Sequence, residues 1–354
     1  MMDISAGWAC PQCGAALEQS GQHLLCPEHG KSGRVEGGIA CFVAEDRYWG
    51  EVPQAEMQEW CRRAEEAGWE RMLSELAQAH PDLHLSASNR IRANWLHLYP
   101  GPVGGSALDL GAGWGAVSEG LTEYFGRVYA VDSAAERTRL LACRFRGRED
   151  HVRVGTAVCP DLPLAPASLQ LVVMNGVLEW LAVGHPARDP MQAQVEALRR
   201  VGRLLQPGGW LYVGIENRFG FHLLQGSLDH SGRPYTSLMP RWWANRVCRG
   251  GEVAYRTDQA GYRTYTYTYW GYRRLLRQAG YGDLRLYAAL PGYNRPEALV
   301  PLARVEPLDA YLAAFADRGR KTALARRVPG RRLRMALARL VVPHFAIFAQ
   351  KGDR

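Results

Sequence analysis

Residues 107–121, ALDLGAGWGAVSEGL, decide the fold of this chain. The first four residues predict a buried strand, Gly111, Gly113 and Gly115 a turn, and the residues from Val117 onward a helix. A strand that leads into a glycine turn and a helix N-terminus is typical of nucleotide sites. Backbone without Cβ atoms can approach a ligand closely, and the helix dipole attracts electron-rich groups. We therefore expect a nucleotide-type ligand at this turn.

Strand and helix patterns alternate through much of the chain after residue 104. This alternation predicts right-handed crossovers and an α/β, Rossmann-like sheet that is mostly parallel, with the ligand beyond the carboxyl ends of the strands. Helices are expected near 117–124, 136–144 and 191–205. The seven expected strands are 107–110, 127–131, 151–154, 169–174, 210–215, 284–289 and 345–350.

Two acids and a second glycine turn narrow the choice of ligand. The glycine turn by itself also satisfies a dinucleotide fingerprint. However, Asp109 ends the first strand, where a carboxylate can bind the cationic amino group of a methionine moiety but would repel a pyrophosphate. Asp132 ends the second strand and is placed to accept hydrogen bonds from two ribose hydroxyls. A Pro-Gly-Gly turn at 207–209 then leads directly into the fifth strand.

Together these motifs closely resemble the class I S-adenosylmethionine-dependent methyltransferases, over residues 104–217 and a last strand near the C-terminus. The resemblance implies an enzyme that binds S-adenosyl-L-methionine. Many members have an acid after the third strand to hold the adenine, whereas this chain offers Thr156, a backbone amide or Asp161. The residues expected at the cofactor are Asp109, Gly111, Ala112, Gly113, Gly115, Asp132, Ser133, Thr156, Ala157, Asn175 and Gly176.

Paired motifs near the N-terminus predict a structural zinc site. Cys10-Pro-Gln-Cys13 is followed after twelve residues by Cys26-Pro-Glu-His29, which is the spacing of three thiolates and one imidazole around tetrahedral zinc. His23 is an alternative to His29. With a closing strand at 37–43, this pattern resembles zinc-ribbon modules that are fused to or partnered with methyltransferases. The ligand spacing is also similar to the zinc finger of bacterial ribosomal-RNA guanine-N1 methyltransferases.

The domain organisation follows from these motifs. We expect a zinc-ribbon-like module at 1–50, a helical cap or linker at 51–103, and the methyltransferase domain at 104–354. The helices of 51–103 could cap a ligand cleft or simply cover one edge of the sheet. Two inserts are expected in the catalytic domain, a substrate cap at 217–270 and a basic helical insert at 295–343.

The insert at 217–270 is dense in polar, aromatic and basic residues and is not needed to complete the sheet. A loop-rich segment at the ligand end of a sheet is where acceptor recognition is usually built. Alternating Thr and Tyr at 264–269 predict a strand that shows its tyrosines to the acceptor or packs them into the core. The residues expected to bind the acceptor are Glu179, Asn217, Arg218, Arg233, Tyr235, Tyr265, Tyr267 and Tyr293.

The same insert holds the candidate base. Methyl transfer to a hydroxyl needs a positioned His or carboxylate to remove a proton, whereas transfer to a ring nitrogen needs mainly alignment. His230 beside Asp229 is the first candidate, followed by Glu216 and His222. Each of these side chains also fits ordinary loop hydrogen bonding.

Composition limits the location of the protein. The chain has 354 residues and a formal net charge of +8, with a run of basic residues and no acid between Arg318 and Arg339. That run fits phosphate, an anionic membrane surface, or a helix packed on the core. The scattered cysteines favour a reducing compartment, and neither a secretory signal nor an apolar stretch of bilayer length is visible. We expect a cytoplasmic protein, with peripheral membrane contact as an option.

Three functional hypotheses follow. The first is an enzyme that methylates oxygen or nitrogen of a small polar acceptor, such as a sugar, a glycan or a specialised metabolite, with a phosphate-bearing or lipid-linked carrier as an option. The segments at 216–220 and 229–235 resemble methyltransferases of bacterial cell-surface polysaccharide and specialised-metabolite pathways. The second is a base methyltransferase acting on ribosomal or other RNA, because of the zinc-finger spacing and the charge. The third is a non-catalytic protein that binds the cofactor and docks a partner, against which the intact cofactor residues argue.

Overall fold

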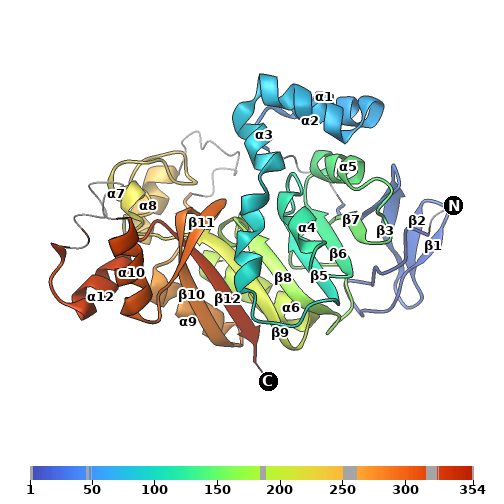
Figure 1. Ribbon diagram of the computed structural model, residues 1–354. Coiled ribbons are helices and arrows are strands. Elements are labelled where there is room, and N and C mark those ends of the chain that lie inside the picture. Colours follow the sequence, from blue (N-terminus) through green and yellow to red (C-terminus); the bar gives the residue numbers. More distant parts are fainter. Residues whose placement is uncertain are drawn as a thin grey trace. The chain divides into compact units, whose positions relative to one another are not determined.

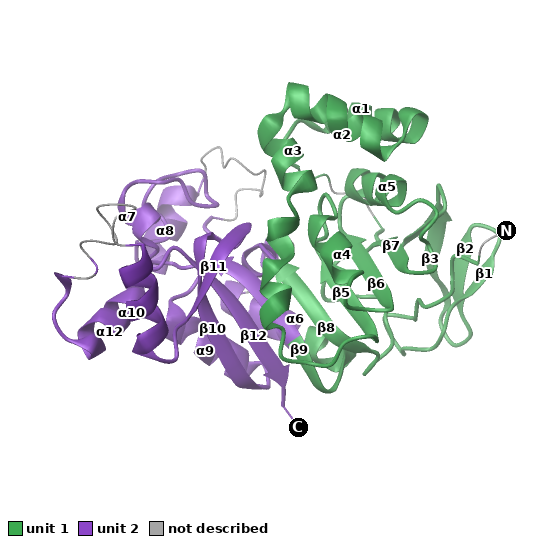
Figure 2. Ribbon diagram, viewed as in Figure 1, with its two compact units in different colours: residues 1–174, 200–210, 353 green, residues 175–199, 211–352, 354 purple. Residues whose placement is uncertain are grey.

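The computed structural model describes residues 3–44, 48, 50–183, 189–249, 261–315, 325 and 327–352. The chain forms two compact units, shown in different colours in Figure 2. Unit 1 contains Met1–Met174 and Arg200–Trp210, and unit 2 contains Asn175–Arg199 and Leu211–Gly352. The helix α6 (Pro190–Leu204) and the strand β9 (Leu205–Glu216) each contribute residues to both units.

The centre of unit 1 is a parallel sheet in the order β7-β6-β5-β8. Its strands are apolar on both faces, with Leu108, Val131 and Val172 fully buried, as expected for parallel strands covered by helices. Each of the two crossovers that join β5, β6 and β7 contains a helix (Figure 1). These elements are β5 (Ser106–Leu110), α4 (Ala116–Leu121), β6 (Arg127–Asp132), α5 (Ala135–Arg144), β7 (Val152–Thr156) and β8 (Leu169–Asn175).

The N-terminal segment extends this sheet. Four antiparallel strands, β1 (Glu18–Ser20), β2 (His23–Cys26), β3 (Gly30–Glu36) and β4 (Ile39–Cys41), form consecutive hairpins. The last of them then pairs in parallel with β7, so that Cys41 lies opposite Thr156. The predicted hairpin and closing strand are confirmed, but the sequence did not reveal that the closing strand joins the sheet of unit 1.

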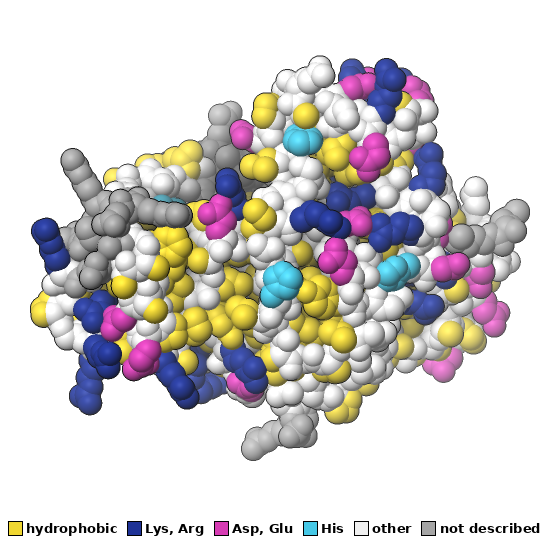
Figure 3. All heavy atoms as spheres, viewed as in Figure 1, with side chains coloured by type: hydrophobic (Ala, Val, Ile, Leu, Met, Phe, Trp, Pro, Cys, Tyr) yellow, Lys and Arg dark blue, Asp and Glu magenta, His cyan; other side chains and the backbone are white. Residues whose placement is uncertain are grey.

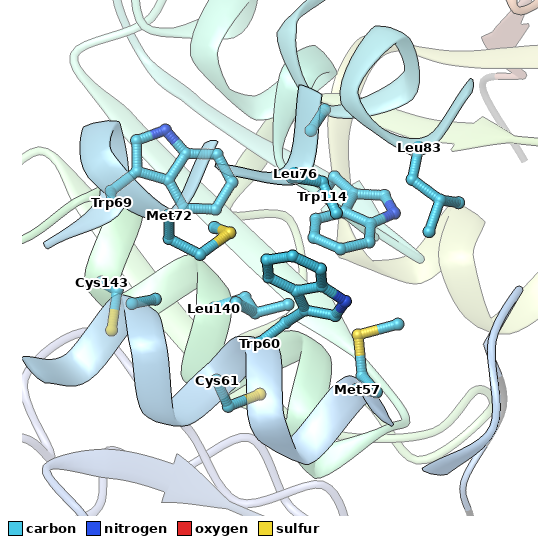
Figure 4. Packing of buried hydrophobic residues seen from close by; sticks show 12 residues of the cluster. Met57, Trp60, Cys61, Trp69, Met72, Leu76, Leu83, Trp114, Leu140 and Cys143 are labelled. Atoms are coloured by element: carbon cyan, nitrogen blue, oxygen red, sulfur yellow. The ribbon is translucent and has the colours of Figure 1, made fainter. Parts of the chain in front are cut away.

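The helical segment of unit 1 packs on the sheet helices and on the glycine turn. Its elements are α1 (Gln54–Ala67), α2 (Trp69–Ala79), α3 (Pro81–Ser88) and the 3₁₀ helix η1 (Arg90–Leu98). Buried side chains of α1, α2 and α3, among them Trp60, Met72 and Leu83, form one hydrophobic cluster with Leu140 of α5 and Trp114 of the glycine turn (Figure 4). The helical segment therefore contacts the turn that decides the fold.

Unit 2 is built on the strand order β9-β12-β10-β11. The C-terminal strand β12 (His344–Lys351) is antiparallel to β10 (Tyr281–Gly292), which is itself antiparallel to β11 (Arg295–Pro301). Inserting β12 between β9 and β10 places the start of β12 beside the end of β10, with His344 opposite Ala289. The helical elements of this unit are η2 (Leu178–Trp180), α7 (Phe221–Leu224), α8 (Arg241–Cys248), α9 (Tyr269–Gln278), α10 (Val305–Ala314) and α12 (Arg331–Val341).

All seven predicted strands are present, and the Rossmann-like fold class is confirmed. The predicted strand at 264–269 is wrong. Tyr267 makes only an isolated bridge to Asn217, and α9 begins at Tyr269. The reason is a helix cap, because the Thr268 hydroxyl accepts a hydrogen bond from the amide of Gly271 at 3.3 Å. The strand predicted at 284–289 is longer than expected, because β10 runs on to Gly292 and turns into β11, which was not predicted.

The basic insert is only partly described, since residues 316–324 and 326 lie outside the described residues. Within α12, Arg334 pairs with Asp309 at 2.6 Å and Arg339 donates to the carbonyl of Leu302 at 2.9 and 2.8 Å, while Met335 is buried. These contacts hold α12 against α10 and the rest of unit 2. No helix within the described ranges is long and apolar enough to cross a bilayer.

Candidate active site

The glycine turn of unit 1 is tied to the end of the second strand. The amides of Gly111 and Ala112 both donate to the carbonyl of Val131, at 2.8 and 3.0 Å, and the amide of Gly113 donates to Oδ2 of Asp132 at 2.9 Å. Both carboxylate oxygens of Asp132 are engaged, since Oδ1 accepts from the amide of Ala134 at 3.1 Å. The turn is therefore ordered by the protein's own hydrogen bonds.

Gly113 and Gly115 of this turn lack a side chain for different physical reasons. Gly113 has a φ of +55°, and the nearest atom to a Cβ there would be a backbone oxygen 4.0 Å away. Gly115 has a φ of +83°, but a Cβ there would lie 2.7 Å from Leu141 and 3.0 Å from Arg144. Gly113 thus faces open space that a ligand can use, whereas Gly115 is required for packing.

Asp109 is buried beside this turn, with 1% of its surface exposed, and accepts a hydrogen bond from Ser118 at 2.6 Å. Burial raises the pKa of Asp109 to about 6, against the effect of the Ser118 hydroxyl. A cation placed beside this carboxylate would restore the charged form. Burial also raises the pKa of Asp132, although backbone amides oppose the shift. A buried carboxylate, an open glycine and an acid at the strand end fit the amino group, backbone approach and ribose of S-adenosylmethionine.

The residues predicted at the adenine are engaged within unit 1. The hydroxyl of Thr156 lies 2.8 Å from that of Thr138, and the amide of Ala157 donates to the carbonyl of Asp132 at 3.0 Å. Ser133 is partly buried, and its amide supports the Asp132 carboxylate. Thr156 and Ala157 therefore shape this end of the sheet, and their contact with adenine stays a prediction.

Arg137 connects the cap to the glycine turn. Its guanidinium is buried, stacks over the Trp114 ring at 4.6 Å and forms an ion pair with Glu51. Burial lowers the pKa of Arg137 to about 10, which leaves the side chain charged at neutral pH. The stack holds Trp114 where the cap helices close over it.

The four predicted metal ligands of the zinc-ribbon module come together. One ligand atom each from Cys10, Cys13, Cys26 and His29 lies within 4.8 Å of the others, whereas His23 does not belong to this group. Burial disfavours the Cys10 thiolate, but hydrogen bonds from the amides of Cys13 and Gln12 and from Ser32 outweigh it and lower the pKa of Cys10 to about 6. A thiolate set with amide support fits a tetrahedral metal site.

In unit 2, acids and histidines gather at one edge of the sheet. Glu216 ends β9, His344 begins β12, and Tyr293 follows β10, while His222 and His230 come from the segment after β9 and Glu179 from η2. We call Glu179, Glu216, His222, His230 and His344 the polar cluster. His344 was not among the predicted site residues.

His230 is clamped between the two acids of the polar cluster. Its Nε2 atom lies 3.1 Å from Oε2 of Glu216 and 3.4 Å from Oε1 of Glu179, at ion-pair distance but without well-aligned hydrogen bonds. Glu179 is fully buried, and neither of its oxygens has a hydrogen-bond partner among the described residues. Burial opposes the charge on His230, but the two carboxylates outweigh it and raise the pKa of His230 to about 10. His230 is therefore a cation at neutral pH and cannot serve as the predicted base in this state.

The other two histidines of the cluster are neutral. The rings of His222 and His344 stack with centroids 5.0 Å apart and planes 9° from parallel. Burial lowers the pKa of His344 to about 4 and that of His222 below its usual value, and Glu216 opposes both shifts. Burial also disfavours the charge on Glu216, but His230 outweighs this effect and lowers its pKa. The Nδ1 atoms of His222 and His344 are buried and lack a hydrogen-bond partner within the described chain.

Asn175, Gly176 and Tyr293 stand beside one another in unit 2. Asn175 donates to Asn294 at 3.2 Å, and a Cβ on Gly176 would lie 2.8 Å from the Tyr293 hydroxyl oxygen. Tyr293 also meets His344 edge to face at 5.3 Å. Gly176 therefore makes room for an aromatic ring that borders the polar cluster.

Several predicted acceptor residues hold the fold of unit 2 instead of facing open space. Asn217 is fully buried and donates to the carbonyls of Leu340 and Val342, both at 2.8 Å. Arg218 donates to the carbonyls of Ser237 and Met239, also at 2.8 Å. Their role in binding an acceptor stays a prediction.

The predicted tyrosines surround an arginine. The guanidinium of Arg241 lies 4.0 Å from the ring centre of Tyr265 and 5.7 Å from that of Tyr267. Tyr267 also donates to Gln194 at 2.6 Å. Tyr265 and Tyr267 are half-buried, whereas Thr264 and Thr266 are buried, so these contacts decide neither alternative.

The predicted pairing of Asp229 with His230 is not formed. Oδ1 of Asp229 accepts from the amide of Ser231 at 2.8 Å, and Oδ2 accepts from Thr236, so the carboxylate closes its own turn. Arg233 and Tyr235 lie in the same turn, with Arg233 half-buried and Tyr235 exposed at a φ of +65°. His230 is left free to meet the acids from β9 and η2.

Comparison with known proteins agrees with this geometry. A family described as "methyltransferase domain" matches residues 108–213, which include the glycine turn, Asp109 and Asp132. The chain contains a class I S-adenosylmethionine-dependent methyltransferase domain. The predicted methyltransferase domain is confirmed over these residues.

Curated relatives of this methyltransferase domain include ubiquinone biosynthesis O-methyltransferases. The protein from Bordetella pertussis is 28% identical over 171 residues, which are 47% of this chain and 63% of the relative. The protein from Xanthomonas oryzae pv. oryzae is 30% identical over 141 residues, which are 39% of this chain and 54% of the relative. The chain thus matches less than two thirds of the length of each.

Among solved structures, a complex of the Haloferax volcanii Trm112 methyltransferase activator with a methyltransferase gives a TM-score of 0.41 at 15% identity. The match covers 83% of this chain and 98% of the matched chain.

Sequence reasoning missed His344 for a physical reason. Nothing local marks a single histidine at the start of the last strand as functional. The expected last strand could have pointed to His344. If that strand is antiparallel and lies beside β10, its first residue comes close to the end of β10.

Proposed function

We propose that this chain transfers a methyl group from S-adenosylmethionine to oxygen or nitrogen of a small polar acceptor, and that unit 2 binds the acceptor. The observation that carries this proposal is the pairing of two features in one chain. In the methyltransferase domain Asp132 bonds the amide of Gly113 and Asp109 is buried beside the same turn, and unit 2 has a buried polar cluster at the edge of its sheet. Buried acids and imidazoles recognise hydroxyl and amino groups better than apolar ones.

When bound, the cofactor supplies an electrophilic methyl group. Asp109 would hold its amino group, Gly113 would allow close approach of the backbone, and Asp132 would accept hydrogen bonds from the ribose. The coarser statement, a small-molecule acceptor, agrees with the small-molecule methyltransferases among the relatives. The finer proposal is that the acceptor is a sugar, a glycan or a specialised metabolite. It is either free or attached to a phosphate-bearing or lipid-linked carrier.

Two measurements test this function. Calorimetry with S-adenosylhomocysteine should show one binding site per chain. The variant Asp132→Ala should bind this ligand about 100-fold more weakly, because two charge-assisted hydrogen bonds are lost. A small-molecule cell extract supplied with methyl-labelled cofactor should then yield a labelled product. Absence of cofactor binding by the intact chain would refute the proposal.

We also propose that Cys10, Cys13, Cys26 and His29 hold a structural Zn²⁺. The support is the convergence of three thiols and one imidazole in a segment too small to fold on an apolar core alone. Metal analysis should find one zinc per chain, and the double variant Cys10→Ser/Cys26→Ser should lose it. Retention of zinc by that variant would rule out these ligands.

An RNA acceptor is the second candidate, and one surface favours it. On α9 the exposed Trp270 lies beside Arg273, Arg274 and Arg277, around a hollow of about 500 Å³. An exposed ring with arginines suits stacked bases and phosphates. Binding of a fluorescent RNA hairpin should then fall steeply with salt and fail in Arg274→Ala/Arg277→Ala, whereas no measurable affinity at low salt excludes this candidate.

Peripheral membrane contact would use the outer face of α12. Leu333 and Leu337 are 49% and 36% exposed on one side of this arginine-rich helix. Over α10 and α12, however, basic side chains lie among acidic ones in Figure 3, in agreement with the pairs of Arg331 and Arg334 with Asp309. Sedimentation with phosphatidylglycerol vesicles, lost in Leu333→Ser/Leu337→Ser, would support the contact, and unbound protein would exclude it.

A further inference from the structure

We propose that the stacked pair His222 and His344 takes the proton from an uncharged hydroxyl acceptor, while His230 serves as a fixed cation between Glu179 and Glu216. This inference rests on the proposed function and adds to it a class of acceptor and a proton acceptor. It changes the order of the candidate bases, since His230 was the first of them.

The geometry of the pair gives it the properties of a base. Two imidazole rings stacked at 5.0 Å cannot both be charged without strong repulsion, so the pair holds at most one added proton. Each ring keeps a buried Nδ1 atom without a hydrogen-bond partner in the described part of the chain. Buried polar atoms of this kind are costly, and a ligand hydroxyl is a suitable partner for them.

The groups around the pair act on its protonation in opposite directions. Burial lowers the pKa of both rings and His230 also lowers that of His344, whereas Glu216 raises the affinity of both rings for a proton. Tyr293 contacts His344 from the segment after β10. A neutral base with a carboxylate behind it stabilises the imidazolium that forms, as acids do in hydrolase triads.

The need for a base points to oxygen as the accepting atom. An oxygen that gains a methyl group while keeping its proton would become a strongly acidic oxonium, so the proton must leave. A methylated amine can keep its proton. The acceptor oxygen forms a bond to the methyl carbon, the carbon–sulfur bond breaks with both electrons staying on sulfur, and the hydroxyl proton moves to an imidazole nitrogen of the pair.

The charge of the polar cluster points to an uncharged acceptor. Glu179 and Glu216 bring two acids to the cluster, and His230 pairs with both, whereas burial lowers the pKa of His222 and His344. Acids thus outnumber the imidazole that pairs with them, which disfavours a phosphate or carboxylate beside the reacting atom. A polyol or sugar hydroxyl fits, and any phosphate of a carrier must lie away from the cluster.

The test compares His222→Gln, His344→Gln and the double variant with His97→Gln, a control at an exposed histidine of unit 1. Methyl-labelled S-adenosylmethionine is supplied with a small-molecule cell extract, and the label is separated into neutral, cationic and anionic products. We expect neutral methyl ethers from the wild type and at least a 100-fold loss in the double variant, with unchanged affinity for S-adenosylhomocysteine. The single variants should lose the rise of rate with pH that the wild type shows.

Histidine NMR supplies a readout independent of activity. At pH 7, ring signals assigned from the variants should show His222 and His344 neutral and His230 charged. A charged His344 at pH 7, a methyl group found on an amine, carboxylate or phosphate oxygen, or full activity of the double variant would each overturn the inference. If the wild type binds no cofactor or transfers no label, the proposed function itself fails.

Discussion

The glycine turn of unit 1 and the polar cluster of unit 2 both contain buried carboxylates, but they treat them in opposite ways. In the turn, both oxygens of Asp132 accept backbone amides, and Asp109 accepts the Ser118 hydroxyl. In the cluster, neither oxygen of Glu179 has a hydrogen-bond partner among the described residues, and its nearby cation is His230. The turn satisfies its acids with its own groups, whereas the described part of the cluster leaves polar atoms without a hydrogen-bond partner.

This difference has an energetic meaning. Amides of a turn cannot leave, so the Asp132 carboxylate keeps these partners although burial raises its pKa. A side-chain cation can lose its proton or be replaced, so the cluster should respond strongly to mutation and to pH. The following predictions test whether the two regions differ in this way.

The largest effect is expected for His230→Gln, which leaves Glu179 as a buried carboxylate without its cation. We expect a loss of about 3 to 5 kcal/mol in the free energy of unfolding at pH 7, measured by urea denaturation, with little change in cofactor affinity. The matched variant Glu179→Gln/His230→Gln should recover most of the loss. The single variant Glu179→Gln completes the comparison. If the loss in the double variant equals the sum of the losses in the two single variants, the pair of His230 with Glu179 does not contribute to stability.

The second-largest effect is a loss in the free energy of unfolding at acid pH, which we attribute to His344. In the folded chain its pKa is about 4, whereas an unfolded histidine titrates near 6.5. As the pH falls below 6.5 the unfolded chain takes up the proton first, so stability is lost between pH 6.5 and 4, by up to about 3 kcal/mol. Urea unfolding at several pH values should show this slope in the wild type and in His97→Gln. The slope should flatten in His344→Gln, and an unchanged slope there would contradict the assignment.

Alanine variants of Gly113 and Gly115 should distinguish the effect of packing from the effect of ligand approach. Gly115→Ala should destabilise the chain by about 2 kcal/mol, because its Cβ would collide with Leu141. Gly113→Ala should cost only about 1 kcal/mol for its left-handed backbone, yet it should weaken cofactor binding more. Thermal unfolding and calorimetry on both variants give the comparison. Equal effects on affinity would mean that Gly113 does not face the cofactor.

The smallest expected effect is the pH dependence of cofactor binding. Asp109 has a pKa of about 6, so acid removes the charge that would hold the amino group. Affinity for S-adenosylhomocysteine at pH 5 should be about tenfold lower than at pH 7, and Asp109→Asn should be weak at both values. A pH-independent affinity in the wild type would show that Asp109 is not the amino-group partner.

Much of unit 1 could be predicted, because its signals are local. The strands, the glycine turn and the four metal ligands are set by spacings of a few residues, and backbone hydrogen bonding enforces them. The strand expected at 264–269 failed because the cap at Thr268 starts a helix that alternation cannot reveal. The join of β4 to β7 also escaped prediction, since sheet partners distant in sequence leave no local trace.

The sequence by itself determined the methyltransferase domain, since Asp109, the glycine turn and Asp132 act within one strand-turn-helix-strand unit. Only the tertiary structure decided the polar cluster. Its residues span positions 179 to 344 and meet because β12 inserts between β9 and β10, which brings His344 to the edge where Glu216 ends. Their charges were decided there too, because burial and neighbouring carboxylates make His230 a cation and leave His222 and His344 neutral.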